Sequence, residues 1–278
     1  MKKNNLKIIV VSSKGGVGKS TISMQLIAPF LYEFNGNSPV AFYEFDDENS
    51  DCLSYGDSKL TNRKIVEVSS PILREDLAEM FLKEETACFD IGGNKTTTMV
   101  LNAFNESGMI HFVDLVVIPL LDGEQDGINA IVIYSVLKDM RPDLKFIFVL
   151  NRAKNHRYVE YQFDNFFGDV RGIFENNNSV RNCLLGDDEN YIAMLDDDII
   201  KYSRRFGLTI YEIAHQNKDF ISLLKLNMKE MSKEQEIKLT SFKNYIKKTS
   251  DTYYDDVLKL GFNKLKFILE RDHDNQAV

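Results

Sequence analysis

A glycine-rich segment near the start of the chain constrains the fold more than any other feature. It reads KGGVGKST over residues 14–21, follows the apolar run 8–11 and precedes a helix-like segment, 22–32. A strand, a glycine turn and a helix in this order form the context of a P-loop, in which backbone N–H groups cradle phosphate oxygens at a helix N-terminus. The segment therefore predicts a nucleotide site.

The P-loop pattern predicts a role for each of its residues. Lys19 is expected to reach the β- and γ-phosphates, and the Ser20 hydroxyl is expected to ligate Mg²⁺. The loop amides bind the remaining phosphate oxygens. The predicted nucleotide-binding residues of the loop are therefore Gly15, Gly16, Val17, Gly18, Lys19, Ser20 and Thr21.

Short apolar runs alternate with helical patterns along the chain, which predicts an α/β fold: a P-loop NTPase with a mostly parallel, twisted sheet flanked by helices. Expected strands are 6–12, 40–45, 65–68, 87–91, 115–119, 146–150 and 191–195. Expected helices are 22–33, 72–83 and 126–139, and a fourth opens at the acidic triplet 196–198.

The last third of the chain predicts a helical extension. Residues 217–270 have a helical pattern that is broken near 249–251, which suggests two helices. The segment of about 155–188, rich in Asn, Asp and aromatic residues, is interpreted as an exposed insertion with a short helix near 158–167. The expected organisation is a P-loop core over 1–215, which includes this insertion, with C-terminal helices packed on it over 216–278.

Carboxylates follow two of the predicted strands. Asp90 lies in the apolar run 87–91, where an unpaired carboxylate is costly to bury, so we expect it to hold Mg²⁺ together with Ser20. Glu44 and Asp46 close the second strand, at the edge where doubly wound sheets bind ligands. Gly92-Gly93 can bring the backbone close to a γ-phosphate and move when that phosphate leaves.

Composition excludes several classes of protein. Apolar residues make up 44% of the 278, enough for a sizeable core, and no run of 18 apolar residues predicts a transmembrane helix. The P-loop strand follows the N-terminus directly, which argues against a signal peptide. The three cysteines lack paired or metal-type spacing, which indicates free thiols in a reducing cytoplasm. The four histidines are isolated, so no transition-metal site is expected.

The loop departs from the ordinary P-loop, because Ser13 replaces its first glycine and Lys14 follows. This form, KGGVGKS, resembles the deviant Walker A motif of the ParA/MinD family of positioning ATPases, and weaker similarities extend over about residues 6–215. The resemblance implies a slow, partner-stimulated ATP hydrolase. In that family the early lysine reaches the ATP of a partner subunit, which implies this role for Lys14.

The resemblance also implies two further site residues. Asp46 matches the family's aspartate near the attacking water, and Asn151 matches an asparagine that hydrogen-bonds adenine. Two departures bear on hydrolysis, because Glu44 replaces the family's first aspartate in this motif and the Pro-Gln pair that usually follows is absent.

The implied cofactors are ATP and Mg²⁺, and the implied partners are a second copy in an ATP-sandwich homodimer, a ParB-like or other adaptor protein, and nonspecific DNA of the nucleoid. The formal net charge of −8 does not favour DNA, but residues 216–278 carry 12 Lys/Arg against 10 Asp/Glu. The candidate basic face there comprises Lys225, Lys229, Lys243, Lys247 and Lys248.

Two alternatives stay open. One is a MinD-like, membrane-recruited positioning ATPase, in which the apolar stripe at positions 258, 262, 265 and 269 would bind lipid. An acidic tail follows that stripe, so we predict that it packs on the core instead. The other is a metabolic P-loop ligase of the dethiobiotin synthetase type, whose glycine loop is similar.

Overall fold

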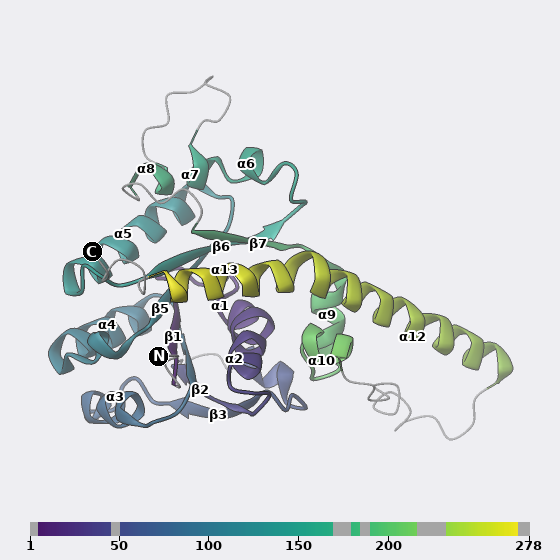
Figure 1. Cartoon of the computed structure of the whole chain (residues 1–278), viewed down its shortest axis with the longest axis horizontal. Helices are drawn as coiled ribbons and strands as arrows, with labels where there is room; N and C mark the ends of the chain where they lie inside the picture. The colour runs from purple at the N-terminus through teal and green to yellow at the C-terminus, as the bar shows by residue number, and fades with distance from the viewer. Residues whose placement is uncertain (1–4, 46–50, 169–178, 184–189, 216–231, 272–278) are drawn as a thin grey trace.

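Parallel strands form a single sheet at the centre of the molecule (Figure 1). The computed structural model describes residues 5–45, 51–168, 179–183, 190–215 and 232–271. In this part of the chain the strand order is β3-β2-β4-β1-β5-β6-β7. The strands are β1 (Lys7–Val11), β2 (Val40–Phe45), β3 (Thr61–Val66), β4 (Ala87–Ile91), β5 (Leu115–Leu120), β6 (Phe146–Ala153) and β7 (Tyr191–Leu195).

The two faces of the sheet bury separate hydrophobic clusters. Side chains alternate along a strand, so Ile8 and Val10 of β1 join one cluster while Ile9 and Val11 join the other. All four side chains are fully buried, as expected for the middle strand of a sheet covered on both faces. The central position of β1, between β4 and β5, places the loop that follows it at the middle of the carboxyl edge.

Helices cover both faces. The first cluster includes residues from α1 (Lys19–Ile22), η1 (Ser23–Ile27), α2 (Ala28–Phe34), η2 (Asp51–Tyr55), α9 (Asp198–Arg205), α10 (Ile210–His215), α12 (Lys233–Tyr253), η4 (Tyr254–Leu258) and α13 (Lys259–Glu270). The second includes residues from α3 (Leu73–Leu82), α4 (Lys95–Ser107), η3 (Met109–Phe112), α5 (Glu124–Met140), α6 (Val159–Gln162), α7 (Asp164–Phe167) and α8 (Val180–Cys183). The predicted fold class, with its parallel sheet, flanking helices and helical C-terminal part, is confirmed.

The C-terminal helices differ from the prediction, because the expected break at 249–251 is wrong. Helix α12 continues through these residues, and a π-helical turn, η4, joins it to α13. Ile246 and Tyr253 on either side are buried in the first cluster, and Lys247 forms an i,i+4 ion pair of 2.5 Å with Asp251, so the helix continues through the polar residues that suggested a break. A capping box at Ser232 and Gln235 fixes the start of α12.

Helix α13 packs on the core as predicted. Leu258, Phe262 and Leu265 of the apolar stripe are buried in the first cluster, and Leu269 packs against it. A β-carbon added at Gly261 would lie 2.9 Å from Leu26 Cδ1, so the two helices approach closely there. The first turns of α12 are exposed, and this part of the helix extends away from the sheet (Figure 1).

Three other elements differ from expectation. Helix α4 was not predicted, because it opens with a run of threonines that favours strands. Strand β3 starts at Thr61 rather than at 65, since an edge strand tolerates the polar residues that precede its apolar end. The described start of the 155–188 segment is not simply exposed, because Phe163 and Phe166 of this segment are buried in the second cluster.

Among the described residues, no helix combines the length and apolar character needed to cross a bilayer. The division of the chain into a core over 1–215 and an extension over 216–278 remains a prediction.

Candidate nucleotide-binding site

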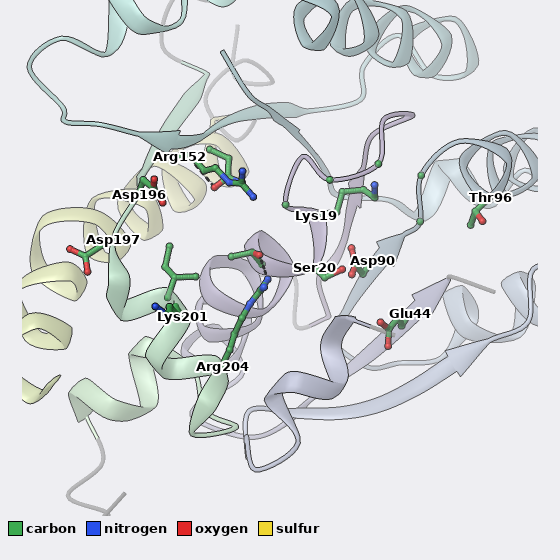
Figure 2. A pocket seen from close by; sticks show the side chains of 18 of the residues that line it. Lys19, Ser20, Glu44, Asp90, Thr96, Arg152, Asp196, Asp197, Lys201 and Arg204 are labelled. Carbon is green, nitrogen blue, oxygen red and sulfur yellow. Dashed lines mark hydrogen bonds between the residues drawn. The ribbon is translucent and has the colours of Figure 1, made fainter. Parts of the chain in front are cut away.

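A pocket of about 940 Å³ lies at the carboxyl edge of the sheet, beside the loop that joins β1 to α1 (Figure 2). This edge is where doubly wound sheets bind ligands. The predicted residues that line the pocket are Gly15, Gly16, Gly18, Lys19, Ser20, Thr21, Asp90 and Asn151. The fold therefore brings together most of the residues that the sequence analysis selected, although their individual roles remain predictions.

The conformation of the loop depends on Gly18. Its φ of 91° lies in the left-handed region, and an added β-carbon would lie 2.1 Å from Asn151 Nδ2. The Asn151 amide donates a 2.8 Å hydrogen bond to the carbonyl of Val17. The Val17 residue, which was predicted to bind the nucleotide, is buried and does not line the pocket. Asn151 thus fixes the loop from the end of β6, in addition to any contact with a base.

Lys19 and Gly93 meet across the phosphate side of the pocket. The Lys19 side chain is buried, and its Nζ donates a 3.0 Å hydrogen bond to the carbonyl of Lys14. A β-carbon at Gly93 would lie 3.1 Å from the Gly15 amide nitrogen and 3.2 Å from Lys19 Nζ. The backbone after β4 therefore passes close enough to the loop that a side chain at position 93 would crowd it, and the expected approach of the Gly92-Gly93 pair to a γ-phosphate stays a prediction.

Lys14 does not line the pocket but pairs with a helix of its own subunit. Its Nζ lies 2.7 Å from Oδ2 of Asp126 in α5, and the Asp126 side chain is only 2% exposed. Within the described part of the chain, the other carboxylate oxygen, Oδ1, is buried without a hydrogen-bond partner. Lys14 is thus the main counter-charge of a buried carboxylate, and its predicted reach to a partner subunit requires this ion pair to open.

Asp90 offers the chemistry of a magnesium ligand. Ser23 Oγ donates a 3.0 Å hydrogen bond to Asp90 Oδ1, and Cys52 Sγ lies 3.6 Å from Oδ2. Burial raises the pKa of Asp90 to about 6, against the opposing effect of hydrogen bonds from Ser20 and Ser23. A desolvated carboxylate beside a serine hydroxyl fits Mg²⁺, which prefers oxygen ligands. The chemistry of Ser20 and Asp90 therefore suits the ion, and their role as its ligands stays a prediction.

Glu44 lies near the same carboxylate. Its side chain is 2% exposed, accepts a hydrogen bond of 3.3 Å from the Cys52 amide, and lies 3.9 Å from Arg63 Nε. Ligand atoms of Glu44, Cys52 and Asp90 lie within 4.8 Å of one another. Asp46, the predicted hydrolytic residue, lies outside the described residues, as do Lys225 and Lys229 of the candidate basic face.

The other half of the pocket was not predicted. It is lined by side chains of the β6 end, the β7–α9 connection, α9 and α12: Arg152, Asp196, Asp197, Asp198, Ile200, Lys201, Arg204 and Tyr245. Arg152 adopts a left-handed φ of 60° at a bulge between β6 and β7, which carries this residue to the pocket edge (Figure 2). The acidic triplet was expected only to open a helix, and it does so through the Asp197 cap on the Ile199 amide.

Solved structures of similar fold were found by comparison with known proteins. No protein-family model matches the sequence, and no curated protein matches it significantly. The MinD cell division protein of Aquifex aeolicus is 13% identical, with a TM-score of 0.50 over 82% of this chain and 98% of that one. A Cyanothece McdA variant in complex with ATP is 14% identical (TM-score 0.46; 82% and 99% covered). A plasmid partition protein from Borrelia burgdorferi is also 14% identical (TM-score 0.45; 87% and 99% covered).

At these identities the similarity concerns the fold alone, and it agrees with the parallel sheet and the P-loop that follows its middle strand. This chain has the fold of the ParA/MinD family of P-loop ATPases.

Proposed function

We propose that the chain is a slow Mg²⁺-dependent ATPase that dimerises around ATP and positions or partitions DNA or a large complex. The observation that carries this proposal is the two-lysine glycine loop, with Lys19 in a pocket that also holds Ser20 and Asp90. The solved structures that share the fold support it, because those named above are a cell division protein, an ATP-bound McdA and a plasmid partition protein.

In this proposal the chain's own groups bind and orient the nucleotide. The loop amides and Lys19 bind the phosphates, and Ser20 and Asp90 hold Mg²⁺, which would supply charge neutralisation on the phosphates when bound. Asp46 orients the attacking water. Loss of the γ-phosphate then releases the contact between the loop and Gly93, in the manner of other γ-phosphate switches.

Dimerisation requires Lys14 to leave Asp126. The ion pair is partly exposed on the lysine side, with 38% of that side chain accessible, so solvent screening weakens it. A partner's triphosphate carries several negative charges and would compete well for this ammonium. In the ATP-sandwich dimer, the Lys14 ammonium would therefore pair with the partner's triphosphate instead of with the Asp126 carboxylate of its own subunit.

The surface recognised by the dimer is proposed to be DNA rather than lipid. Phe262 and Leu265, which a lipid-binding helix would need to expose, are packed in the core. Three lysines of the candidate basic face, Lys243, Lys247 and Lys248, lie on α12, although Lys247 pairs with Asp251. An adaptor of the ParB type would stimulate hydrolysis and so set the lifetime of the bound state.

The test compares binding of an arbitrary DNA duplex by Asp46→Ala protein with ATP and with ADP at low salt. We expect binding only with ATP, because this substitution should trap the ATP dimer, and a steep loss of binding as salt is added. Lys19→Ala is the matched control that should neither bind ATP nor bind DNA. Absence of DNA binding with both nucleotides would refute the DNA role, whereas absence of ATP binding by the unmodified protein would refute the ATPase itself.

A further inference from the structure

Arg204 has a position in the pocket that the P-loop pattern does not account for. It lies in the last turn of α9, is half-buried, and points toward the helix that follows the P-loop (Figure 2). Arg152 and Lys201 line the same pocket (Figure 2).

The contacts of its guanidinium are unusual for a half-buried cation. Nη2 donates to the Thr21 hydroxyl, Nε donates a 3.1 Å hydrogen bond to the Tyr55 hydroxyl, and the group lies 5.8 Å from the centre of the Tyr55 ring. In the described parts of the chain these partners are all neutral, and no carboxylate forms an ion pair with Arg204. A partly desolvated cation without a counter-charge favours an anion in the adjoining pocket.

The neighbour of Arg204 indicates which anion this is. Thr21 follows Ser20 in the first turn of the P-loop helix, where backbone N–H groups meet the phosphates nearest the sugar. The γ-phosphate is expected at the opposite end of the triphosphate, beside Lys19 and Gly93. We propose that Arg204 binds the α-phosphate of the nucleotide, a contact made equally by nucleoside di- and triphosphates. This inference rests on the proposed nucleotide site.

A buried polar network holds Arg204 in place. Gln25, fully buried in the π-helical turn η1, donates hydrogen bonds of 3.1 Å to the Tyr55 hydroxyl and 2.7 Å to Ser203 Oγ. Its carbonyl oxygen accepts a 2.8 Å hydrogen bond from the Ile210 amide at the start of α10. The P-loop helix, η2 and the α9–α10 pair are thus joined at one point. Tyr55 is a positioning residue, because it orients the guanidinium and has no place in the pocket lining.

The test is calorimetric titration of the protein with ATP and with ADP, each with Mg²⁺. Arg204→Gln should weaken both nucleotides by the same factor, about 10- to 100-fold, because one charge-assisted contact to a shared phosphate is lost. Arg205→Gln is the matched control, since Arg205 is the exposed neighbour in the same turn and loses the same charge. Its affinities should remain those of the unmodified protein.

Two further variants separate a ligand contact from a structural role. Arg204→Lys keeps the charge without the planar fork and should recover part of the affinity. Tyr55→Phe keeps the arginine but removes the hydroxyl that orients it, so a smaller and again equal loss is expected for ATP and ADP. Melting temperatures without nucleotide identify any variant that fails to fold, and the ATP-to-ADP affinity ratio is read on the folded ones.

The outcomes discriminate between the two proposals. Equal affinities of Arg204→Gln and Arg205→Gln would overturn the assignment of Arg204, and a loss confined to ATP would overturn the choice of the α-phosphate. If the unmodified protein binds neither nucleotide, the proposed function fails first and this inference fails with it.

Discussion

Asp90→Asn should raise the stability of the nucleotide-free protein, by an amount that grows with pH. The ordinary pKa of an aspartate is 3.8, and burial raises that of Asp90 to about 6. Between these values the folded state binds more protons than the unfolded chain, so the free energy of unfolding falls as pH rises from about 4 and levels off above 6. An asparagine of the same shape does not titrate and escapes this loss.

The magnitude follows from the two pKa values. Their difference corresponds to about 3 kcal/mol at full ionisation, with about 1.36 kcal/mol for each pKa unit. Part of this loss has already occurred at pH 4.5, so the advantage of Asp90→Asn over the unmodified protein should be about 2 kcal/mol larger at pH 7.5 than at pH 4.5. The Ser23 hydrogen bond to Oδ1 survives the substitution, because an amide oxygen also accepts.

The assay is urea unfolding at pH 4.5 and pH 7.5 in a chelating buffer without nucleotide. Asp139→Asn, at an exposed position of α5, controls for the loss of one negative charge. Adding Mg²⁺ at pH 7.5 should stabilise the unmodified protein and not Asp90→Asn, because the ion compensates the buried carboxylate. If the advantage of Asp90→Asn is the same at both pH values, or is larger at pH 4.5, then burial does not dominate at Asp90 and the reasoning fails.

Three other perturbations give separate tests. Lys14→Gln should cost about 1–3 kcal/mol of stability by leaving the Asp126 carboxylate buried without its counter-charge, and adding Asp126→Asn should recover most of it, as measured by a double-mutant cycle. Additive effects would show that the pair is not coupled. Gly18→Ala should lower ATP affinity by at least tenfold in a binding titration, because the new β-carbon collides with the Asn151 amide and the left-handed φ adds strain. Leu265→Ala should cost about 2–5 kcal/mol in urea unfolding, since this side chain of α13 is fully buried; a cost below 1 kcal/mol would mean that α13 does not pack on the core.

The sequence was sufficient to predict the central strands and to select the P-loop residues that line the pocket, and there is a physical reason. Strands such as β2, β4 and β7 are buried on both faces or nearly so, and they read as short apolar runs with unchanged bounds. The P-loop is encoded by one contiguous motif, in which near neighbours such as Lys14 and Lys19 contact each other, although Asn151 of β6 also holds the loop. Local patterns of this kind are visible in a single sequence.

The remaining features depend on contacts between distant residues. Arg204 meets Thr21 across 183 positions, and Lys14 meets Asp126 across 112, so no spacing rule could select either pair. The break expected at 249–251 was wrong for a related reason. The polar residues there have low helix propensity, whereas burial of their apolar neighbours Ile246 and Tyr253 in the first cluster overrides that local preference.

The central position of β1 has a consequence for how this protein is made. Ile8 pairs with Leu115, 107 residues further along, and Val10 pairs with Asp90 on the other side. At about 5–20 residues per second, the ribosome needs roughly 5–20 s after making β1 to supply its second neighbour. During that interval an apolar strand and its glycine loop have no partner on one side. The nascent chain therefore has a window in which chaperone binding or misassociation competes with folding, and the nucleotide cannot assist until the window closes.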